Sequence, residues 1–203
     1  MSKRCIIVQG LTYQNSINQI KECWKGYDVI YSTWKGDEWM YSPDDMVIFS
    51  DIPKNPGVKN LLLQKESTIA GLKLAKELGY ERALKWRSDM WTNNSDELIK
   101  LFHVDSYNTL CWVNHDGGYT TDYFMEDTID NLLQVWDVNS DECFPERVLT
   151  KRIESLGWMN RINYIISDLT PEVDVYWNKP GRAYWMSKLK EQADLYKKEI
   201  YGR

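Results

Sequence analysis

The sequence predicts an α/β protein with a mostly parallel central sheet and helices on both of its faces. Short, continuous apolar runs, typical of strands buried on both faces, alternate with segments whose apolar residues recur at helical spacing. This strand–helix–strand order favours right-handed crossovers between parallel strands. The chain has 203 residues and no internal repeat, so we expect residues 1–203 to form a single domain.

The first half of the chain supplies the strands that define this sheet. Strands are expected at Cys5–Val8, Tyr27–Tyr31, Met46–Phe49 and Arg82–Trp86, and helices at Asn15–Trp24 and Asn60–Leu78. Gly79 ends the second of these helices, since glycine readily takes the left-handed conformation that follows a helix.

The second half mixes shorter strands with helices. Helices are expected at 95–102, 128–136, 145–156 and 188–201, strands at 110–113, 164–166 and 173–176, a turn at 116–118 and a short strand or bend at 121–125. Ser95 is a plausible cap for the first of these helices, and Pro145 with Glu146 is a typical helix start.

Composition narrows the function classes. A net charge of −5 gives no electrostatic argument for a nucleic acid or an anionic membrane as partner. The 10 Trp and 13 Tyr suit either a cleft that stacks on rings, sugars among them, or simply an aromatic core and surface. The four scattered cysteines form no zinc pattern. Without an apolar run of membrane-spanning length or a leader segment, we expect a soluble protein of the reducing cytoplasm.

Polar clusters follow four predicted strands of the first half. They are Gln9–Thr12, Ser32–Trp34, Ser50–Asp51 and Arg87–Asp89. The carboxyl ends of parallel strands meet at one edge of a sheet, where α/β proteins bind ligands, so these clusters should line one cleft. Neither a G-x-G-x-x-G nor a Walker motif is present, so a nucleotide would bind there without those loops.

Arg87 and Asp89 at the end of the fourth strand allow two interpretations. The Asp89 carboxylate is a suitable ligand for a divalent metal, and the planar Arg87 guanidinium suits a phosphate. Alternatively, the two side chains form an ordinary surface ion pair, which is common and contributes little. The spacing alone leaves both interpretations open.

Several short motifs, in this order, resemble those of the WavE-type glycosyltransferases of polysaccharide synthesis. They are Val8–Gly10, Ser32–Gly36, Asn60 with Gln64, Ser67–Thr68 and Gly71–Leu72, Lys85–Asp89, Thr121–Phe124 and Pro145–Glu146, over roughly residues 5–156. The chain is similar as well to the N-terminal transferase domain of chlorovirus multidomain glycosyltransferases. The resemblance implies a GT-A fold, a nucleotide-sugar donor, a glycan acceptor and a divalent metal, Mn²⁺ or Mg²⁺. It also allows for further enzyme domains in a longer native chain.

The resemblance also implies roles for individual residues. The Asp-x-Asp motif of such enzymes falls on Arg87–Asp89, so Arg87 replaces the first acid and Asp89 is the only motif carboxylate left for the metal. Donor binding is expected from Gln9, Gly10, Thr12, Ser32, Thr33, Trp34, Gln64, Lys85 and Arg87. The part up to about residue 90 would bind the nucleotide, and residues 91–203 the acceptor.

Two carboxylates compete for the role of catalytic base. Glu146 matches the base of inverting members, and its place at a helix start should lower its pKa and keep it ionised. Asp122 is the rival, with a contact to the acceptor hydroxyl as its expected role. A module that binds nucleotide sugar or carbohydrate without turnover is the alternative function. The missing first acid favours that module, whereas Asp89 and Glu146 argue against it.

Overall fold

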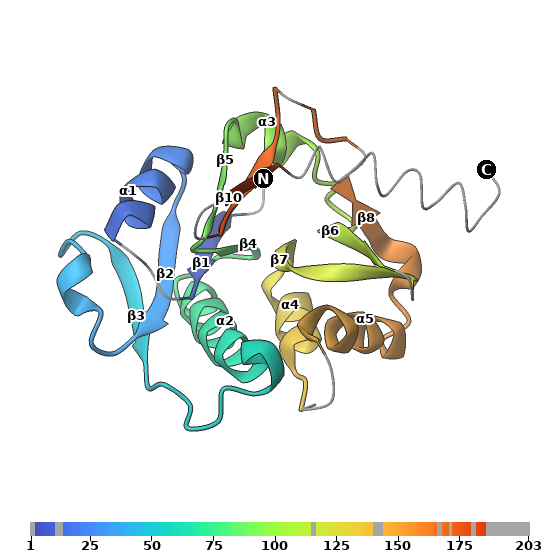
Figure 1. Ribbon diagram of the computed structural model, residues 1–203, viewed down its shortest axis with the longest axis horizontal. Helices are drawn as coiled ribbons and strands as arrows, with labels where there is room; N and C mark the ends of the chain where they lie inside the picture. The colour runs from blue at the N-terminus through green and yellow to red at the C-terminus, as the bar shows by residue number, and fades with distance from the viewer. Residues whose placement is uncertain are drawn as a thin grey trace.

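The computed structural model describes residues 3–10, 14–114, 117–139, 144–165, 168–170, 172–179 and 182–185 (Figure 1). The strands are β1 Arg4–Gln9, β2 Val29–Trp34, β3 Met46–Ser50, β4 Arg82–Arg87, β5 Met90–Thr92, β6 Tyr107–Asn114, β7 Gly117–Thr128, β8 Ile162–Tyr164, β9 Val175–Lys179 and β10 Arg182–Trp185. The helices are α1 Gln14–Cys23, α2 Leu61–Glu77, α3 Ser95–Lys100, α4 Ile129–Trp136 and α5 Pro145–Ser155. Short 3₁₀ turns lie at η1 Glu38–Met40, η2 Val58–Asn60 and η3 Met159–Arg161.

A seven-stranded sheet in the order β3-β2-β1-β4-β7-β6-β8 forms the centre of the protein. Strands β3, β2, β1 and β4 are parallel, β7 runs antiparallel to β4 and β6, and β8 is again parallel to β6. The mostly parallel sheet predicted from the sequence is therefore confirmed. Strands β5, β9 and β10 form a second, small antiparallel sheet.

Helices cover both faces of the large sheet (Figure 1). Strand β1 shows why: Cys5 and Ile7 pack on the side of α2, α4 and α5, while Ile6 and Val8 pack on the side of α1 and α3. Successive side chains of a strand point to opposite faces, so an unbroken apolar run requires a cover on each. The largest aromatic side chains fill these two cores: Trp24, Trp86 and Trp136 are fully buried. For these three, the core interpretation of the aromatic composition is correct.

Helix α2 lies unusually close to the sheet at Gly71. A Cβ at this position would lie 2.5 Å from Ile7 Cγ2, closer than such atoms approach, and 3.1 Å from Ser32 Cβ, which is a tight contact. Ser32 of β2 also holds α2 against the sheet, because its hydroxyl donates to the Ser67 carbonyl of α2. Glycine thus lets α2 bring its first turns against the carboxyl ends of the strands.

Some elements differ from the sequence expectation. Strand β2 continues through Ser32–Trp34, because these residues pair with β3 up to Ser50. Gly117 and Gly118 begin β7 instead of completing a turn. Asn94, not Ser95, caps α3, since its Oδ1 accepts from the Glu97 N–H at 3.2 Å. The helix expected at 188–201 lies outside the described residues.

Within the described ranges, none of the helices combines the length and apolar character that crossing a bilayer requires. Cys5 and Cys23 are unbridged thiols, and burial raises the pKa of each to about 12. Cys5 behaves as the small core residue that its strand position predicts, with 1% of its surface exposed.

Candidate active site

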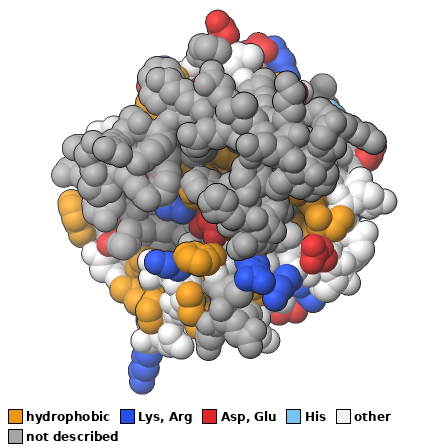
Figure 2. Space-filling model, turned by 45° about the vertical axis from the view of Figure 1, so that its right-hand side comes forward, with side chains coloured by type: hydrophobic (Ala, Val, Ile, Leu, Met, Phe, Trp, Pro, Cys, Tyr) orange, Lys and Arg blue, Asp and Glu red, His pale blue; other side chains and the backbone are white. Residues whose placement is uncertain are grey.

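A cavity of about 280 Å³ opens where β1, β2 and β4 end beside the start of α2. Its lining residues are Gln9, Gly10, Trp34, Asn60, Leu63, Gln64, Arg87, Ser88 and Asp89. Three of the four polar clusters that follow predicted strands therefore contribute to one cleft. Figure 2 shows one face of the molecule, on which basic and acidic side chains lie together among hydrophobic ones near its centre.

Backbone contacts fix the floor of this cavity. Gly10 has a φ of +113°, a conformation that few residues other than glycine adopt, and its N–H donates to the Ser32 carbonyl at 3.2 Å. The Ser88 N–H donates to the Gln9 carbonyl at 3.0 Å. Residues 88–89 form a tight turn between β4 and β5, which is held by a 2.9 Å bond from Trp86 Nε1 to the Met90 carbonyl. The turn places the Asp89 side chain at the cavity.

Arg87 is held by two carboxylates and an aromatic ring. Its Nε lies 2.9 Å from Asp89 Oδ1 and its Nη2 lies 2.7 Å from Asp89 Oδ2. Its Nη1 donates to Asp122 Oδ2 at 3.2 Å, and the Tyr123 ring centroid lies 5.2 Å from its Cζ. Burial lowers the pKa of Arg87, but Asp122 and Asp89 outweigh it and raise the pKa above its ordinary value. The predicted ion pair exists, and it forms part of the cavity wall, with side chains 23% and 28% exposed.

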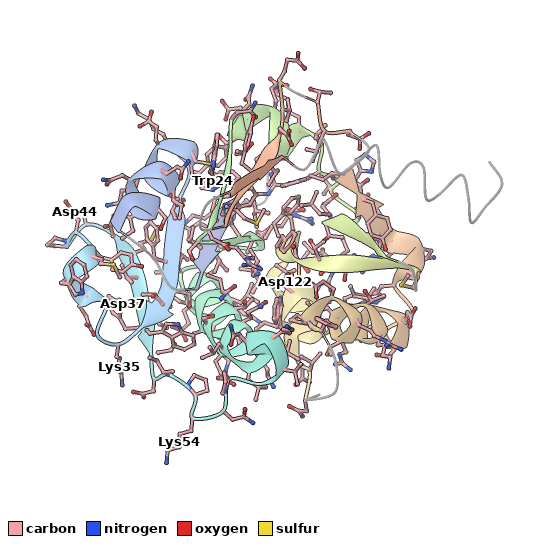
Figure 3. The ribbon with its side chains drawn as sticks, viewed as in Figure 1. Trp24, Lys35, Asp37, Asp44, Lys54 and Asp122 are labelled. Carbon is pink, nitrogen blue, oxygen red and sulfur yellow. The ribbon has the colours of Figure 1, made fainter. Side chains whose placement is uncertain are left out.

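An irregularity in β7 directs Asp122 toward this guanidinium. Between the pairs Thr109↔Met125 and Cys111↔Thr120, a single residue of β6 lies opposite residues 121–124 of β7. Such bulges bend a strand and re-aim its side chains. The Asp122 side chain is only 2% exposed, and Figure 3 shows it inside the molecule, between α2 and β7. Its Oδ1 accepts from no donor among the residues described.

Glu146, in the first turn of α5, completes the cluster of carboxyls. Its carboxyl lies close enough to that of Asp122 for the two acids to interact electrostatically. Burial, and after it the charge of Asp122, raises the pKa of Glu146 to about 7. The expectation that the helix start lowers this pKa is therefore wrong, because backbone hydrogen bonding is a smaller effect than burial.

Lys85 lies below the cavity and is not among the residues that line it. Its Nζ donates to the Asp122 carbonyl, at the bulge in β7, and lies 5.3 Å from the centroid of the Trp136 ring. Full burial lowers the pKa of Lys85 to about 7. Lys85 thus supports the segment that carries Asp122, and its expected role in binding the nucleotide sugar stays a prediction.

The remaining residues that were predicted to bind the nucleotide sugar divide into two groups. Gln9, Gly10, Trp34 and Gln64 line the cavity, and Gln64 Oε1 is buried without a donor among the described residues. The side chains of the other two hold the fold: Ser32 bonds to α2, and Thr33 Oγ1 donates to Asp37 Oδ2 at 2.8 Å. Thr12 lies outside the described residues.

Three residues at the site received no role from the sequence. Tyr123 lies in one of the quoted motifs, but only the structure shows its ring against Arg87. Ser88 lies between Arg87 and Asp89, which both have predicted roles. Asn60 lines the cavity with φ +64°, next to Lys59 with φ +51°. Asparagine tolerates this left-handed conformation better than most residues, and its place before a helix was the available signal.

In the described arrangement, the site does not fit a divalent cation well. Both Asp89 oxygens accept from Arg87, and Asp122 Oδ2 accepts from the same guanidinium. A divalent ion bound to Asp89 would lie close to that guanidinium and would be repelled by it, which offsets part of the attraction of the carboxylates. Among the described residues, no three His, Cys, Asp or Glu side chains form a group suited to a metal. The Mn²⁺ or Mg²⁺ expected from the resemblance therefore stays a prediction, and the position of Arg87 argues against it.

No protein-family profile and no curated protein sequence matches the chain. Among solved structures, it is similar to a candidate nucleotide-diphospho-sugar transferase from Desulfovibrio desulfuricans G20, with 14% identity and a TM-score of 0.53 over 81% of this chain and 80% of that chain. It is also similar to 4-diphosphocytidyl-2C-methyl-D-erythritol synthase from Anaerococcus prevotii DSM 20548, with 11% identity and a TM-score of 0.49 over 79% and 86%. No argument rests on this second likeness. The first shows the fold of nucleotide-diphospho-sugar transferases, as predicted; the resemblance to WavE-type and chlorovirus enzymes stays a prediction.

Proposed function

We propose that the chain is a glycosyltransferase of hexosyltransferase type, which moves a sugar from a nucleoside diphosphate sugar to a hydroxyl of a glycan. One observation carries this proposal: the buried carboxyls of Glu146 and Asp122 lie next to Arg87, which lines a cavity formed by the ends of β1, β2 and β4. A candidate base and a cation for the leaving group thus belong to the same site, and glycosyl transfer needs both. The fold likeness supports a nucleotide sugar as the substrate.

The donor would lie across the carboxyl ends of the parallel strands. The nucleoside part is assigned to the side of Gln9, Gly10 and Trp34, and the diphosphate to Arg87. Gln64 Oε1, which lacks a donor among the described residues, would accept from a ribose hydroxyl or a base N–H. Uridine is the proposed nucleoside.

In the proposed reaction, an acceptor oxygen attacks the anomeric carbon while the bond from that carbon to the diphosphate breaks. The bonding electrons leave with the diphosphate, whose growing negative charge Arg87 stabilises. The ionised Glu146 takes the proton of the acceptor hydroxyl, and Asp122 holds that hydroxyl in place. A single displacement of this kind inverts the anomeric configuration.

Other expectations remain part of this proposal. Residues up to about 90 would form the donor part and residues 91–203 the acceptor part of one transferase domain. A role in polysaccharide synthesis, a location in the cytoplasm and further enzyme domains in a longer native chain stay predictions. A metal, if one takes part, would have Asp89 as its protein ligand.

The alternative is a module that binds a nucleotide sugar or a carbohydrate without turnover. It is favoured by Arg87 in the place of the first motif acid, because a lost metal ligand is one way in which a transferase site becomes inactive. The buried Glu146–Asp122 pair argues against it, since burying two carboxyls together is costly and suits acid–base chemistry.

A panel of nucleotide sugars, offered with and without glycan acceptors and Mn²⁺, tests the proposal through release of nucleoside diphosphate. We expect release that depends on an acceptor and that Glu146→Gln lowers by about 10²-fold or more, while calorimetry shows that this variant still binds the nucleotide. Binding without release in the wild-type protein would support the module instead. Absence of both binding and release across the panel would contradict both functions.

A further inference from the structure

We propose that Arg87 takes the place of the divalent cation, so that this chain binds the donor diphosphate, and lets it leave, without a metal. This inference rests on the proposed function and specifies how the same site handles the negative charge of its substrate. It departs from the metal dependence that the sequence resemblance implies.

The first argument is the occupation of the only motif carboxylate. Asp89 would be the ligand of a metal, but both of its oxygens accept from Arg87, at 2.9 and 2.7 Å. A side-on pair of this kind uses the fixed fork of the guanidinium and is among the stronger ion-pair geometries. A metal would have to break this pair before it could bind Asp89.

The second argument is the balance of charge. Two carboxylates that hold a divalent cation carry a net charge of zero, and an arginine paired with one carboxylate carries the same net charge. Compared with an Asp-x-Asp motif, this chain has an arginine in the place of the first acid. The charge of its motif is therefore balanced without a divalent cation from solution. With Asp122 included, the three side chains already carry a net charge of −1, and adding a divalent ion would leave +1 beside the Arg87 guanidinium.

The third argument is the placement of the guanidinium. Asp122 Oδ2 and the Tyr123 ring hold Arg87 from the side of β7, while Arg87 and Asp89 both line the cavity. A cation fixed before the substrate arrives needs little reorganisation as charge develops on the leaving diphosphate. Burial of most of the Arg87 side chain also strengthens its electrostatic effect compared with an exposed arginine.

Calorimetry with the wild-type protein gives the primary test. The tightest ligand among UDP, GDP, CDP and ADP is titrated after chelation with EDTA, and again with Mn²⁺ or Mg²⁺ present. We expect the dissociation constants to agree within about twofold. A loss of tenfold or more on chelation, restored by a metal, would overturn this inference but leave the proposed function intact. If none of the four nucleotides binds in either condition, the proposed function fails as well.

A variant that restores the motif gives a second test. Arg87→Asp recreates the Asp-x-Asp pattern, so we expect metal-free nucleotide affinity to fall at least tenfold and Mn²⁺ to restore much of it. Arg87→Ala should lose affinity to a similar extent without rescue by the metal. Lys54→Asp, the same charge reversal at an exposed lysine outside the cavity lining, should change neither value. Equal affinity of Arg87→Asp and the wild-type protein without metal would contradict the role of Arg87. The wild-type chelation experiment decides the question even if Arg87→Asp fails to fold.

Discussion

At the scale of single residues, the protonation of Glu146 connects the burial of the site to its chemistry. Burial next to Asp122 raises the Glu146 pKa to about 7, so this carboxyl is only partly ionised at neutral pH. A general base acts in its deprotonated form, and a base works best with a pKa near the working pH. The same burial that costs stability thus suits Glu146 to accept a proton.

We expect kcat/KM to fall as the pH drops below about 7, because protonation of Glu146 removes the base. Glu146→Gln should lower the transfer rate by about 10²-fold or more and abolish this acidic limb, with little change in donor affinity. Asp122→Asn should mainly raise the KM for the acceptor. A pH–rate profile for the three proteins checks this. If Glu146→Gln keeps a near-normal rate and Asp122→Asn is inactive with donor binding intact, the two roles are exchanged.

The same carboxyl should make stability depend on pH. The folded pKa of Glu146, about 7, lies above the ordinary value of 4.5, so the native state binds more protons between these values. Stability from this group is therefore fully present below about pH 4.5 and is lost as the pH rises through 7. Glu146→Gln should raise the melting temperature at pH 8 more than at pH 5, relative to the wild-type protein. Glu154→Gln, an exposed site on the same helix, should show no such difference between the two pH values.

Lys85 should give stability the opposite pH dependence. Its folded pKa, about 7, lies below the ordinary value of 10.5, so the buried ammonium costs stability fully below pH 7 and less as the pH rises toward 10.5. Lys85→Met should therefore raise the melting temperature at pH 7 and lose this advantage near pH 10.5. It also removes the bond to the Asp122 carbonyl, so kcat should fall by up to about 10²-fold while nucleotide affinity holds. A stabilised variant with an unchanged kcat would show that the bond does not position Asp122.

At the scale of elements, sequence predicts best where one strong local signal decides the structure. The unbroken apolar run of β1 specifies a strand covered on both faces, and Pro145 specifies the start of α5. Strand β7 was mostly missed because polar residues within it are buried with partners far away in sequence. Thr120, for example, bonds to Thr150, and Asp122 and Glu126 of the same strand bond to arginines of β4. Strand β5, with three residues, is too short for any pattern.

The approach of α2 to the sheet gives a prediction for a whole element. Gly71→Ala should lower the free energy of unfolding by about 1–3 kcal/mol net of the helix-propensity gain, because its Cβ would overlap Ile7. In an open helix position, the same change would stabilise by about 1 kcal/mol. Urea unfolding of Gly71→Ala, beside the exposed α2 variant Lys73→Ala as control, measures the effect. Unchanged stability of Gly71→Ala would mean that α2 can move away from β1 at no cost.

At the scale of the whole molecule, chain order and sheet topology together account for what the sequence could say about the site. Gln9 and Arg87 come together because parallel strands end at one edge, and this follows from the βαβ pattern alone. The pattern does not predict to which face of the sheet a strand residue points, nor that Glu146 lies next to Asp122. Ser32 turned out to bond to α2, and Glu146 to share a buried position with Asp122, because both depend on how distant elements pack.

Strand β4 joins two buried charged clusters of different kind. At its end, Arg87 and Asp122 lie beside the cavity, and Asp122 Oδ1 has no donor among the described residues. At its start, both Glu126 oxygens are bonded by Arg82, at 2.8 and 2.9 Å, and also by Arg4 at 3.1 Å and Asn108 at 2.6 Å. Satisfied networks of this kind hold a structure together, whereas polar atoms left without a partner suit ligand binding.

This difference predicts opposite effects for two similar substitutions. Glu126→Gln leaves the Arg82 charge buried without its main partner, so it should lower the free energy of unfolding by about 3–5 kcal/mol. Asp122→Asn should cost much less, because Arg87 keeps Asp89 as its partner beside the open cavity. Urea unfolding measures both values, and calorimetry in the absence of denaturant should show near-normal nucleotide affinity for Glu126→Gln. If the two variants lose stability equally, the cluster at the end of β4 serves the fold as much as the cluster at its start.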